Sequence, residues 1–342
     1  MTIHLMHNQK FIMPFIEFMN EHFDSNDHLF IIVGGVSEKE YPIKKFENVE
    51  VWEQNITRYF NIIFFFNKLR AKLLIADRIV LHSLYFPRIT SFLFLNRSFL
   101  KKCYWVMWGG DFYFPEKQNW IKKQVIKHIE HFVTYIKGDY ELAKKWYGAT
   151  GKYHECFMYP SNLYKEYDIK PKEHDTINIQ LGNSADPSNN HIDVLKQLTK
   201  YKDENIKIFV PLSYGDEEYA QEVIKYGKEI FADKFIPLTE FMPFEKYLEF
   251  LGGIDIAIFA HKRQQAMGNT ITLLGLGKKV HMRSDITPWQ LFKEIDVKVF
   301  DVANIEIDLI DKQTQKENQQ KIKEYFSQAN YLKQLQNLFE SK

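Results

Sequence analysis

The sequence predicts an α/β protein with two parallel-sheet domains that face each other across a cleft. Strand-like and helix-like segments alternate through the first half, a polar stretch follows at residues 165–175, and the alternation then restarts. Such alternation is typical of parallel sheets, because a crossover helix must connect each strand to the next. The 342 residues are enough for two cores. A single TIM barrel is the weaker alternative, since the polar stretch and the restart divide the chain.

This division predicts three ranges. Residues 1–165 form an N-terminal domain, residues 176–312 form a C-terminal domain, and residues 313–342 are helices that are candidates to pack back on the N-terminal domain. Hydrophobic periodicity separates the strands from the helices. In the N-terminal domain we expect strands at 3–6, 29–35, 49–53, 78–86, 103–112 and the start of 131–148, and helices at 11–23, 57–74, 119–132 and the end of 131–148.

The second half repeats the pattern. We expect strands at 177–184, 206–215, 234–242 and 254–261, helices at 191–201, 217–231 and after Pro243, a helix and a strand within 268–282, and a helical region at 313–340 that is broken near 327–330. Open parallel sheets bind ligands beyond the carboxyl ends of their strands. Polar residues that directly follow these strands are therefore the candidates for a functional site.

The composition argues against several classes of protein. With 45 basic and 44 acidic residues the net charge is +1, which gives no global attraction to nucleic acid. Cys103 and Cys156 lie far apart in apolar surroundings, so we expect reduced, buried thiols. The first residues lack the pattern of a signal peptide, and no run of eighteen apolar residues occurs. We therefore expect a cytoplasmic protein that meets a membrane only from its surface.

The loop GNSADPSNNHI (182–192) links a predicted strand to a predicted helix. Its glycine lets the backbone approach a ligand closely, and the helix N-terminus offers unpaired N–H groups and a partial positive charge. Both features suit a diphosphate, although the same residues also suit a turn that only caps the helix. No dinucleotide-binding glycine motif and no P-loop is present. The residues expected to line the diphosphate are Gly182, Asn183, Ser184, Ser188 and Asn190.

The segment AHKRQQAMGNT (260–270) is a second candidate for diphosphate binding. His261, Lys262 and Arg263 gather positive charge at a strand end, where Arg263 is placed to neutralise a leaving diphosphate. A solvated basic turn is the alternative, and the glutamines and the helix start that follow favour the functional interpretation. The residues expected to contact the donor are Arg263, Gln264, Gly268, Asn269 and Thr270.

The segment WVMWGGDFY (105–113) ends a predicted strand with a carboxylate. Group transfer to a hydroxyl needs a base, and a carboxylate or histidine at a strand's carboxyl end is correctly placed for that role. Asp111 is the leading candidate, with His82 and His7 as substitutes, although a lone histidine is more often structural. The wall of the cleft is expected to comprise Trp108, Gly109 and Gly110.

The sequence contains no metal-binding motif, whereas two segments have a pattern that suits a membrane surface. We find no HExxH, CxxC or Asp-x-Asp motif, so we expect no metal and no resident cofactor.

Residues 58–74 and 119–132 mix apolar residues with Lys and Arg, a pattern that can dock on anionic lipid headgroups. An ordinary helix with one buried face is the alternative for either segment.

Five segments together resemble the Fuc4NAc (4-acetamido-4,6-dideoxygalactose) transferases of enterobacterial common antigen synthesis. They are WVMWGGDFY (105–113), GNSADPSNNHI (182–192), FVPLSYG (209–215), RQQAMGNTITLL (263–274) and PWQ (288–290). The resemblance covers most of the chain from residue 100 onward, and the first hundred residues match only loosely. The family reads Gly-Ala-Asp at 109–111 and Gly-Asp-Arg-Ser-Asn at 185–189. The arginine absent at Pro187 leaves open how the donor is held.

The resemblance implies a GT-B glycosyltransferase with two Rossmann-like domains and no metal. It implies a dTDP-linked nucleotide-sugar donor, from which the enzyme transfers a Fuc4NAc-like deoxyamino sugar to a lipid-diphosphate-linked saccharide in bacterial surface glycan synthesis. The protein would then associate peripherally with the inner face of the cytoplasmic membrane. Two alternatives remain open at this point: a non-hydrolysing nucleotide-sugar epimerase and a non-catalytic GT-B-like scaffold subunit.

Overall fold

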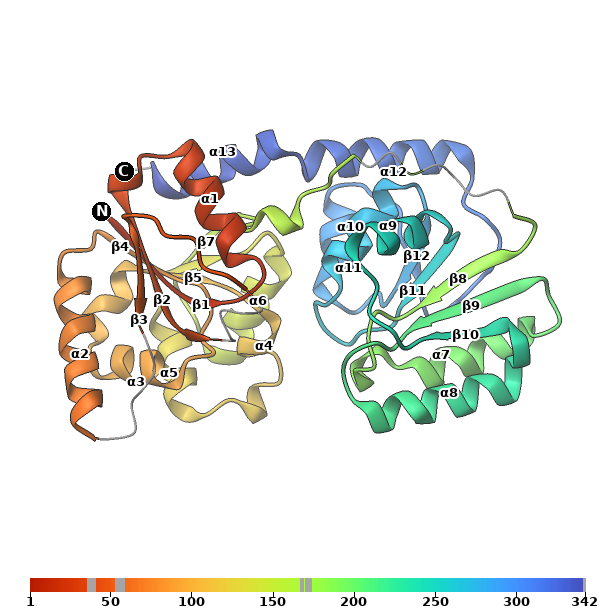
Figure 1. The fold of residues 1–342 in the computed structure, drawn as a ribbon, viewed down its shortest axis with the longest axis horizontal. Helices are drawn as coiled ribbons and strands as arrows, with labels where there is room; N and C mark the ends of the chain where they lie inside the picture. The colour runs from red at the N-terminus through yellow and green to blue at the C-terminus, as the bar shows by residue number, and fades with distance from the viewer. Residues whose placement is uncertain (36–40, 53–58, 167–168, 170–173, 341–342) are drawn as a thin grey trace. The chain divides into compact units, whose positions relative to one another are not determined.

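The computed structural model describes residues 1–35, 41–52, 59–166, 169 and 174–340 (Figure 1). The chain divides into two compact units. Unit 1 comprises Met1–Asn162 and Tyr331–Lys342, and unit 2 comprises Leu163–Asn330. Each unit contains one open sheet. Most of the predicted linker, 165–175, lies outside the described residues, as do the ends of the predicted strand 49–53 and helix 57–74.

The sheet of unit 1 has seven strands in the order β3-β2-β1-β4-β5-β6-β7. All described pairings in it are parallel. This order means that the chain first winds outward from β1 on one side and then returns to continue on the other. The strands are β1 (Thr2–Asn8), β2 (His28–Gly35), β3 (Val49–Trp52), β4 (Arg78–Leu81), β5 (Cys103–Val106), β6 (His131–Val133) and β7 (Lys152–His154).

Alternation along the strands of unit 1 divides its helices between two faces. Ile3 and Leu5 belong to a core shared with residues of α2, α3, α5 and α6. His4, between them, faces the other side, where its ring meets Phe15 of α1 and Phe339 of α13. The helices are α1 (Ile12–His22), α2 (Tyr59–Leu74), α3 (Pro87–Leu95), α4 (Gly109–Phe112), α5 (Trp120–His128), α6 (Lys137–Tyr147) and α13 (Gln328–Phe339).

The C-terminal helix α13 is fixed to unit 1 by hydrogen bonds from deep in its core. The Tyr331 hydroxyl donates to the carbonyl of Met158 at 2.9 Å, and the Gln334 side-chain oxygen accepts from the backbone N–H of Phe157 at 3.0 Å. Tyr331 is fully buried. From Tyr331 onward, the end of the chain is therefore part of the first unit's core.

The sheet of unit 2 has six strands in the order β10-β9-β8-β11-β12-β13, and its described pairings are again parallel. Figure 1 shows α7 and α8 on one face of this sheet and α9 and α10 on the other. The strands are β8 (Ile177–Leu181), β9 (Ile206–Pro211), β10 (Phe235–Leu238), β11 (Ile256–Phe259), β12 (Lys279–Met282) and β13 (Phe300–Asp301). The helices are α7 (His191–Leu198), α8 (Glu217–Phe231), α9 (Phe244–Gly252), α10 (Met267–Gly275), α11 (Thr287–Glu294) and α12 (Lys312–Tyr325).

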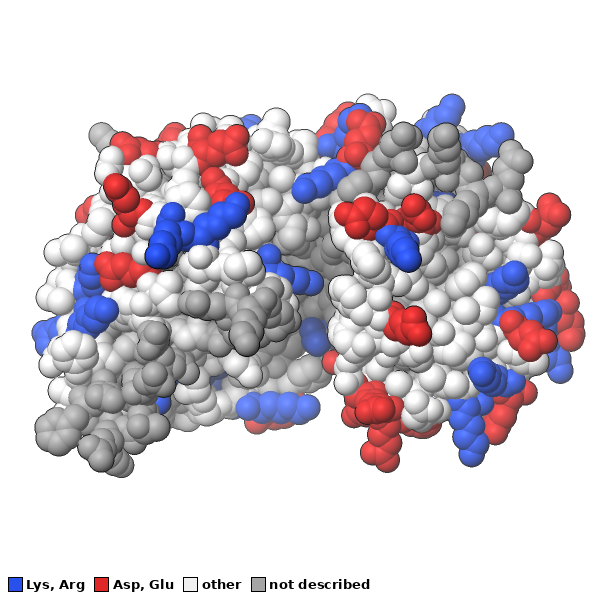
Figure 2. All heavy atoms as spheres, in the orientation of Figure 1, with Lys and Arg blue, Asp and Glu red and all other residues white. Residues whose placement is uncertain are grey.

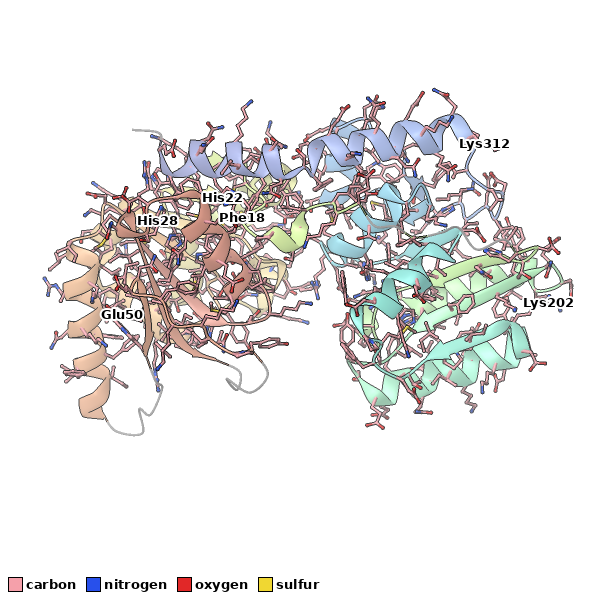
Figure 3. The ribbon with its side chains drawn as sticks, turned by 45° about the horizontal axis from the view of Figure 1, so that its top comes forward. Phe18, His22, His28, Glu50, Lys202 and Lys312 are labelled. Atoms are coloured by element: carbon pink, nitrogen blue, oxygen red, sulfur yellow. The ribbon has the colours of Figure 1, made fainter. Side chains whose placement is uncertain are left out.

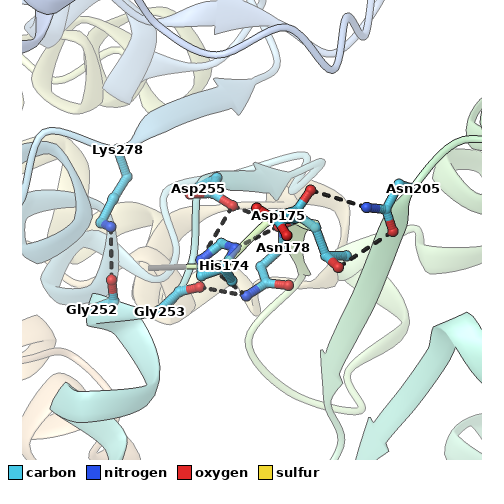
Figure 4. Close-up of polar contacts among 9 residues, drawn as sticks. His174, Asp175, Asn178, Asn205, Gly252, Gly253, Asp255 and Lys278 are labelled. Carbon is cyan, nitrogen blue, oxygen red and sulfur yellow. Dashed lines mark hydrogen bonds and ion pairs between the residues drawn. The ribbon is translucent and has the colours of Figure 1, made fainter. Parts of the chain in front are cut away.

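Polar contacts at the amino edge of this second sheet tie the segment before β8 to its neighbours (Figure 4). The Asp255 carboxylate accepts from the backbone N–H of Asn178 at 2.8 Å and lies 3.7 Å from His174 Nε2. The Asn178 side chain donates to the carbonyl of Gly253 at 2.8 Å. These bonds fix where β8 begins.

The two predicted parallel-sheet domains are confirmed, and two separate open sheets exclude a TIM barrel. Several predicted strands run past the observed carboxyl ends, and two of them, both in unit 1, do so by five residues or more. The strand predicted at 103–112 ends at Val106, and Gly109–Phe112 is the short helix α4. Asp111 lies in this turn, and its backbone N–H donates to the carbonyl of Trp108 at 2.9 Å. The strand predicted at 78–86 ends at Leu81, since Pro87 begins α3 and Pro suits a first helical turn.

No helix among the described residues is long and apolar enough to cross a bilayer. Both cysteines are buried free thiols, as predicted. Burial raises the pKa of the Cys156 thiol to about 12 and also raises that of Cys103. Both thiols are therefore protonated at neutral pH and act as small apolar side chains.

Burial also lowers the pKa of most histidines in this chain. The nine affected residues, out of twelve, are His4, His7, His28, His82, His131, His154, His191, His261 and His281. In each, desolvation is the largest cause. The folded protein therefore holds these rings neutral at pH values where an exposed histidine takes up a proton.

We expect the free energy of unfolding to fall steeply as the pH drops from 6.5, the ordinary histidine value, toward about 4. The unfolded chain takes up protons over this range while the folded chain does not, so each such ring costs up to about 1.4 kcal/mol per pH unit. Asp111, whose pKa is raised, acts in the opposite direction but is a single group. Urea unfolding at pH 7.5, 6.5 and 5.5 measures the effect. A midpoint that stays constant across these three values would contradict the neutral, buried histidines.

Candidate functional site

Asp111 lies beyond the carboxyl end of β5 and connects two loops of unit 1. Its Oδ2 accepts from the backbone N–H of Leu84 at 2.8 Å and from the Trp105 indole at 3.2 Å. The residue is only 2% exposed. Burial raises the pKa of its carboxyl to about 6, although the hydrogen bonds and the charge of Lys122 act to lower it. Asp111 is therefore an anion at neutral pH that holds the loops after β4 and β5 together.

His82 directly follows β4, and both of its ring nitrogens have partners. Nδ1 lies 2.8 Å from the Tyr159 hydroxyl, and Nε2 lies 3.0 Å from His4 Nδ1. Burial lowers the pKa of His82 to about 3. The ring is neutral, and no lone pair on it is left for a substrate proton.

His7 lies near the carboxyl end of β1 and differs from His82. Its Nε2 is buried without a hydrogen-bond partner, and its ring packs on Phe86 at a centroid distance of 4.2 Å. Burial lowers its pKa to about 4, so this ring is also neutral. A neutral imidazole has one nitrogen that can accept a proton. Of the three predicted bases, His7 is the one whose ring is not committed to an internal hydrogen bond.

The predicted wall residues lie at the same edge. Trp108 is half-buried and packs against Phe11 and Tyr159, at centroid distances of 4.7 and 5.9 Å. Gly109 is buried, whereas Gly110 is exposed and a side chain built there would meet no atom within 4 Å. Trp105, in contrast, is fully buried in the core. Trp108 and Gly110 thus border open space in unit 1.

In unit 2, the loop after β8 is organised around Asn189, which is fully buried. Its amide donates to the carbonyl of Asp186 at 2.9 Å and to Ser184 Oγ at 3.3 Å, and its oxygen accepts from the backbone N–H of Asn183 at 3.0 Å. His261 Nε2, from the loop after β11, lies 2.7 Å from the same oxygen. Because an amide oxygen only accepts, His261 carries its proton on Nε2.

This contact corrects one prediction. The sequence suggested that His261 adds positive charge to the diphosphate loop. In the structure His261 is 2% exposed, and burial lowers its pKa to about 3. It is a neutral positioning residue, because desolvation of a charged imidazole there would cost more than the nearby Asp186 carboxylate returns. Of the three basic residues in the predicted cluster, Lys262 and Arg263 alone bring charge.

Three further hydrogen bonds join the loops after β8 and β11. Ser188 Oγ donates to Gln265 Oε1 at 2.9 Å, and the Gln265 amide donates to Asn183 Oδ1 at 3.4 Å. The Asn190 side chain donates to the carbonyl of Ala260 at 2.7 Å. The structure therefore brings the two predicted diphosphate loops together at one edge of the unit 2 sheet.

Gly182 is required by the packing of this loop. Its φ of 68° is in the left-handed region, and an added Cβ would lie 2.4 Å from His191 Nε2 and 2.8 Å from Asn189 Oδ1. Both neighbours are fully buried side chains. The space that a side chain would need is filled by the protein itself.

The start of α10 carries the remaining predicted donor residues. Gly268 is exposed, and Asn269 is half-buried. The Thr270 hydroxyl donates to the carbonyl of Ala266 at 3.1 Å and is buried, so it stabilises the helix start. Arg263 is half-buried, and its guanidinium donates to the carbonyl of Gln264 at 3.2 Å. The first-turn N–H groups and Arg263 are the positively polarised groups at this edge.

A comparison with protein families identifies the chain. Residues 4–342 match the family model described as 4-alpha-L-fucosyltransferase, glycosyl transferase group 56. The chain belongs to this family. The predicted family resemblance and the predicted glycosyltransferase activity are therefore confirmed, and membership implies a nucleotide-sugar donor and a glycan acceptor.

Solved structures with a similar fold are glycosyltransferases of the GT-B class, so the predicted fold class is confirmed. A glycosyltransferase from Rickettsia africae has 13% identity and a TM-score of 0.64, with coverage of 99% of this chain and 97% of that one. Anabaena HepE, solved with UDP and glucose, has 12% identity, a TM-score of 0.67 and coverage of 99% and 100%. Sucrose-phosphate synthase from Thermosynechococcus elongatus has 9% identity, a TM-score of 0.68 and coverage of 99% and 98%.

Three residues were missed as parts of these sites. Asn189 belongs to a run of loop asparagines, so its position was visible, but its burial was not. Tyr159 and His4 are far from His82 in sequence, and no local pattern connects them. Among the described residues, no group of three or more His, Cys, Asp or Glu side chains could hold a metal ion.

Proposed function

We propose that this group 56 enzyme transfers a Fuc4NAc-like deoxyamino sugar from a dTDP-linked donor to a lipid-diphosphate-linked saccharide in bacterial surface glycan synthesis. The observation that carries the proposal is the joined pair of loops at the carboxyl edge of the unit 2 sheet. The bonds from Ser188 to Gln265 and from Asn189 to His261 make them one surface. The segments that resemble Fuc4NAc transferases include both loops.

In this proposal, unit 2 holds the donor diphosphate. The exposed backbone at Gly268 and the first turn of α10 offer N–H groups, and Arg263 offers a guanidinium. Asn183 and Ser188 supply further polar atoms from the facing loop. As the bond between the sugar and the diphosphate breaks, negative charge develops on the phosphate oxygens, and these groups stabilise it. No metal is assigned a role.

Unit 1 supplies the acceptor wall and the base. The acceptor hydroxyl oxygen attacks the anomeric carbon of the sugar, the bond from that carbon to the diphosphate oxygen breaks, and the hydroxyl proton passes to the base. His7 is the base in this proposal, since Asp111 and His82 are already committed to internal hydrogen bonds. Trp108 offers a flat apolar face to a sugar ring, and Gly110 leaves the space for one.

The proposed acceptor is attached to lipid, which requires contact with a membrane. Helix α2 exposes apolar side chains beside basic ones: Ile63 is 63% exposed, Phe64 is 71% exposed, and Lys68 and Arg70 are exposed nearby. Such a surface suits the headgroup region of an anionic bilayer. Figure 2 shows basic and acidic side chains interspersed over the visible face.

Flotation with vesicles tests this contact. We expect the protein to bind vesicles that contain anionic phospholipid and the variant Ile63→Ser with Phe64→Ser to bind at least about tenfold more weakly, since each lost apolar side chain removes buried area. Leu309→Ser, at an exposed apolar position of unit 2, is the matched control. Equal binding by the double variant and the wild type would remove α2 from the proposal.

The donor proposal is tested by melting temperature. A ligand that binds only the folded protein raises its melting temperature. With EDTA present, we expect a rise with dTDP that exceeds the rise with UDP, GDP, CMP or NAD, and we expect Arg263→Ala to lose most of it. Lys207→Ala, an exposed lysine on β9, is the control for a general loss of charge. A preference for another nucleotide would replace dTDP in the proposal, and no rise with any nucleotide would contradict it.

Kinetics distinguish the candidate bases. We expect His7→Gln to lower kcat by about a hundredfold or more with little change in the KM for the donor, because removal of a general base slows the chemical step. His128→Gln, at an exposed histidine of α5, should match the wild type. Burial raises the pKa of Asp111 to about 6. If His7→Gln stays active and kcat/KM decreases as the pH is lowered through about 6, then Asp111 is the base. Free nucleotide-sugar epimers as products would indicate an epimerase.

A further inference from the structure

Three helices on one face of the unit 1 sheet carry basic residues without any acidic ones. Helices α2, α3 and α5 and the short segment Arg97–Lys102 contain ten lysines or arginines and no aspartate or glutamate. The whole chain, in contrast, has 45 basic and 44 acidic residues. The asymmetry ends at α6, which packs beside α5 and contains Asp139 and Glu141. The positive charge is therefore a local property of these three helices and the segment between them.

The three helices lie side by side. The ring of Phe66, on α2, packs on that of Phe92, on α3, at a centroid distance of 5.3 Å. The ring of Phe94, also on α3, packs on that of Trp120, the first residue of α5, at 5.1 Å. All three helices contribute residues to the core on this face of the sheet. Their outward side, together with that of Arg97–Lys102, is called the helix face below.

Several charges on the helix face are not neutralised by the protein. The ion pairs between described residues include none of Arg70, Lys101 and Lys127, and all three side chains are exposed. Lys72 differs, because its Nζ lies 2.5 Å from Oε1 of Glu50 on β3, which Figure 3 labels beside α2. Unpaired cations gathered on one surface attract an anionic partner.

Exposed apolar side chains lie among these charges. Trp120 is 61% exposed and Leu95 is 69% exposed. The guanidinium of Arg97 lies 4.8 Å from the centre of the Phe94 ring, which Trp120 also contacts. These four residues are called the Trp120 cluster. A tryptophan and a large aliphatic side chain beside cations are typical of surfaces that bind the headgroup region of a bilayer. Leu95 favours lipid over nucleic acid as the partner, because a leucine gains most from an apolar environment.

We propose that the helix face docks on the headgroup region of an anionic phospholipid bilayer, where the Trp120 cluster inserts as a second contact beside Ile63 and Phe64 of α2. The contact of α2 is taken from the proposed function, and the inference rests on it only in that respect. Each basic residue near an anionic membrane strengthens binding about fivefold. Two apolar contacts on one compact unit reinforce each other, because binding of the first holds the second close to the surface.

Tryptophan fluorescence tests the insertion of Trp120 directly. The structure describes all six tryptophans, and Trp120 is the one that is exposed. We expect phosphatidylglycerol vesicles with brominated acyl chains to quench the fluorescence of the wild type, because bromine quenches an indole at short range. Trp120→Phe should still bind these vesicles and should lose most of the quenching. Quenching that is equal in Trp120→Phe and the wild type would overturn the insertion.

Flotation with vesicles tests the charge of the helix face. With vesicles rich in phosphatidylglycerol, we expect Lys101→Gln with Lys127→Gln to weaken binding about tenfold or more, and added salt to weaken binding of the wild type. Lys225→Gln with Lys228→Gln, at two exposed positions of α8, is the matched control and should bind as the wild type does. Equal losses in the two pairs would mean that total charge governs binding, which contradicts a defined face.

A third set of variants tests the apolar contact. We expect Leu95→Ser with Trp120→Ser to weaken vesicle binding about tenfold or more, because both side chains lose buried apolar area. The same pair combined with Ile63→Ser and Phe64→Ser should bind more weakly than either pair alone. If the folded Leu95 and Trp120 variant binds as tightly as the wild type, the Trp120 cluster is not a contact. If the wild type binds a single-stranded oligonucleotide more tightly than the vesicles, the partner is nucleic acid and the inference is wrong.

None of these measurements depends on sugar transfer, so the two proposals fail separately. If the wild type binds vesicles and is quenched as expected but transfers no sugar, the proposed function fails and the membrane-binding face stands. If the wild type transfers sugar but shows neither flotation nor quenching, the helix face is wrong while the transferase activity stands.

Discussion

The parallel arrangement of every described strand pairing is the constraint on which the rest of this structure depends. Parallel strands need a crossover after each strand, so all carboxyl ends of one sheet lie at the same edge. Residues far apart in sequence, such as His7, Leu84 and Asp111 in unit 1, then meet in one set of loops. In unit 2 the same constraint brings the loops after β8 and β11 together, although Asn189 and His261 are 72 positions apart in the sequence.

The backbone at these edges leaves polar groups that must be satisfied without a sheet partner. The protein meets this need with single buried side chains that bond backbone groups and neighbouring side chains. Asp111 accepts from the backbone N–H of Leu84 and from the Trp105 indole, and Asn189 bonds both Asn183 and Asp186. Such residues hold loops in one shape, and the loops in turn present Trp108 and Arg263. In the proposed function, the positioning residues and the residues that contact substrate therefore lie within a few positions of each other.

Neutral histidines are the second recurring feature. A ring buried without charge must donate from one nitrogen and can accept at the other, so it conveys a direction along a hydrogen-bonded chain. His261 shows the simplest case, because Asn189 fixes its proton on Nε2. His82, His4 and His28 are three further buried rings that are joined by hydrogen bonds in unit 1. Desolvation, the largest influence on the pKa of these rings, makes this possible.

The sequence alone determined much of this protein. The alternation of apolar runs and amphipathic helices predicted two parallel sheets, because period-2 and period-3.6 patterns are local properties of the chain. Motif segments such as 182–192 and 263–274 predicted the family. Loop composition also predicted the two candidate diphosphate loops, since glycine, asparagine and serine gather at these strand ends.

What only the tertiary structure decided is the state of each polar side chain. The sequence gave His261 a charge and offered Asp111, His82 and His7 as candidate bases without showing which side chains lose their water. Burial and partner atoms come from strands and loops that are distant in sequence, as with His4 and His82 or Leu84 and Asp111. Protonation, hydrogen-bond direction and access to substrate all depend on those contacts, and no local pattern of residues encodes them.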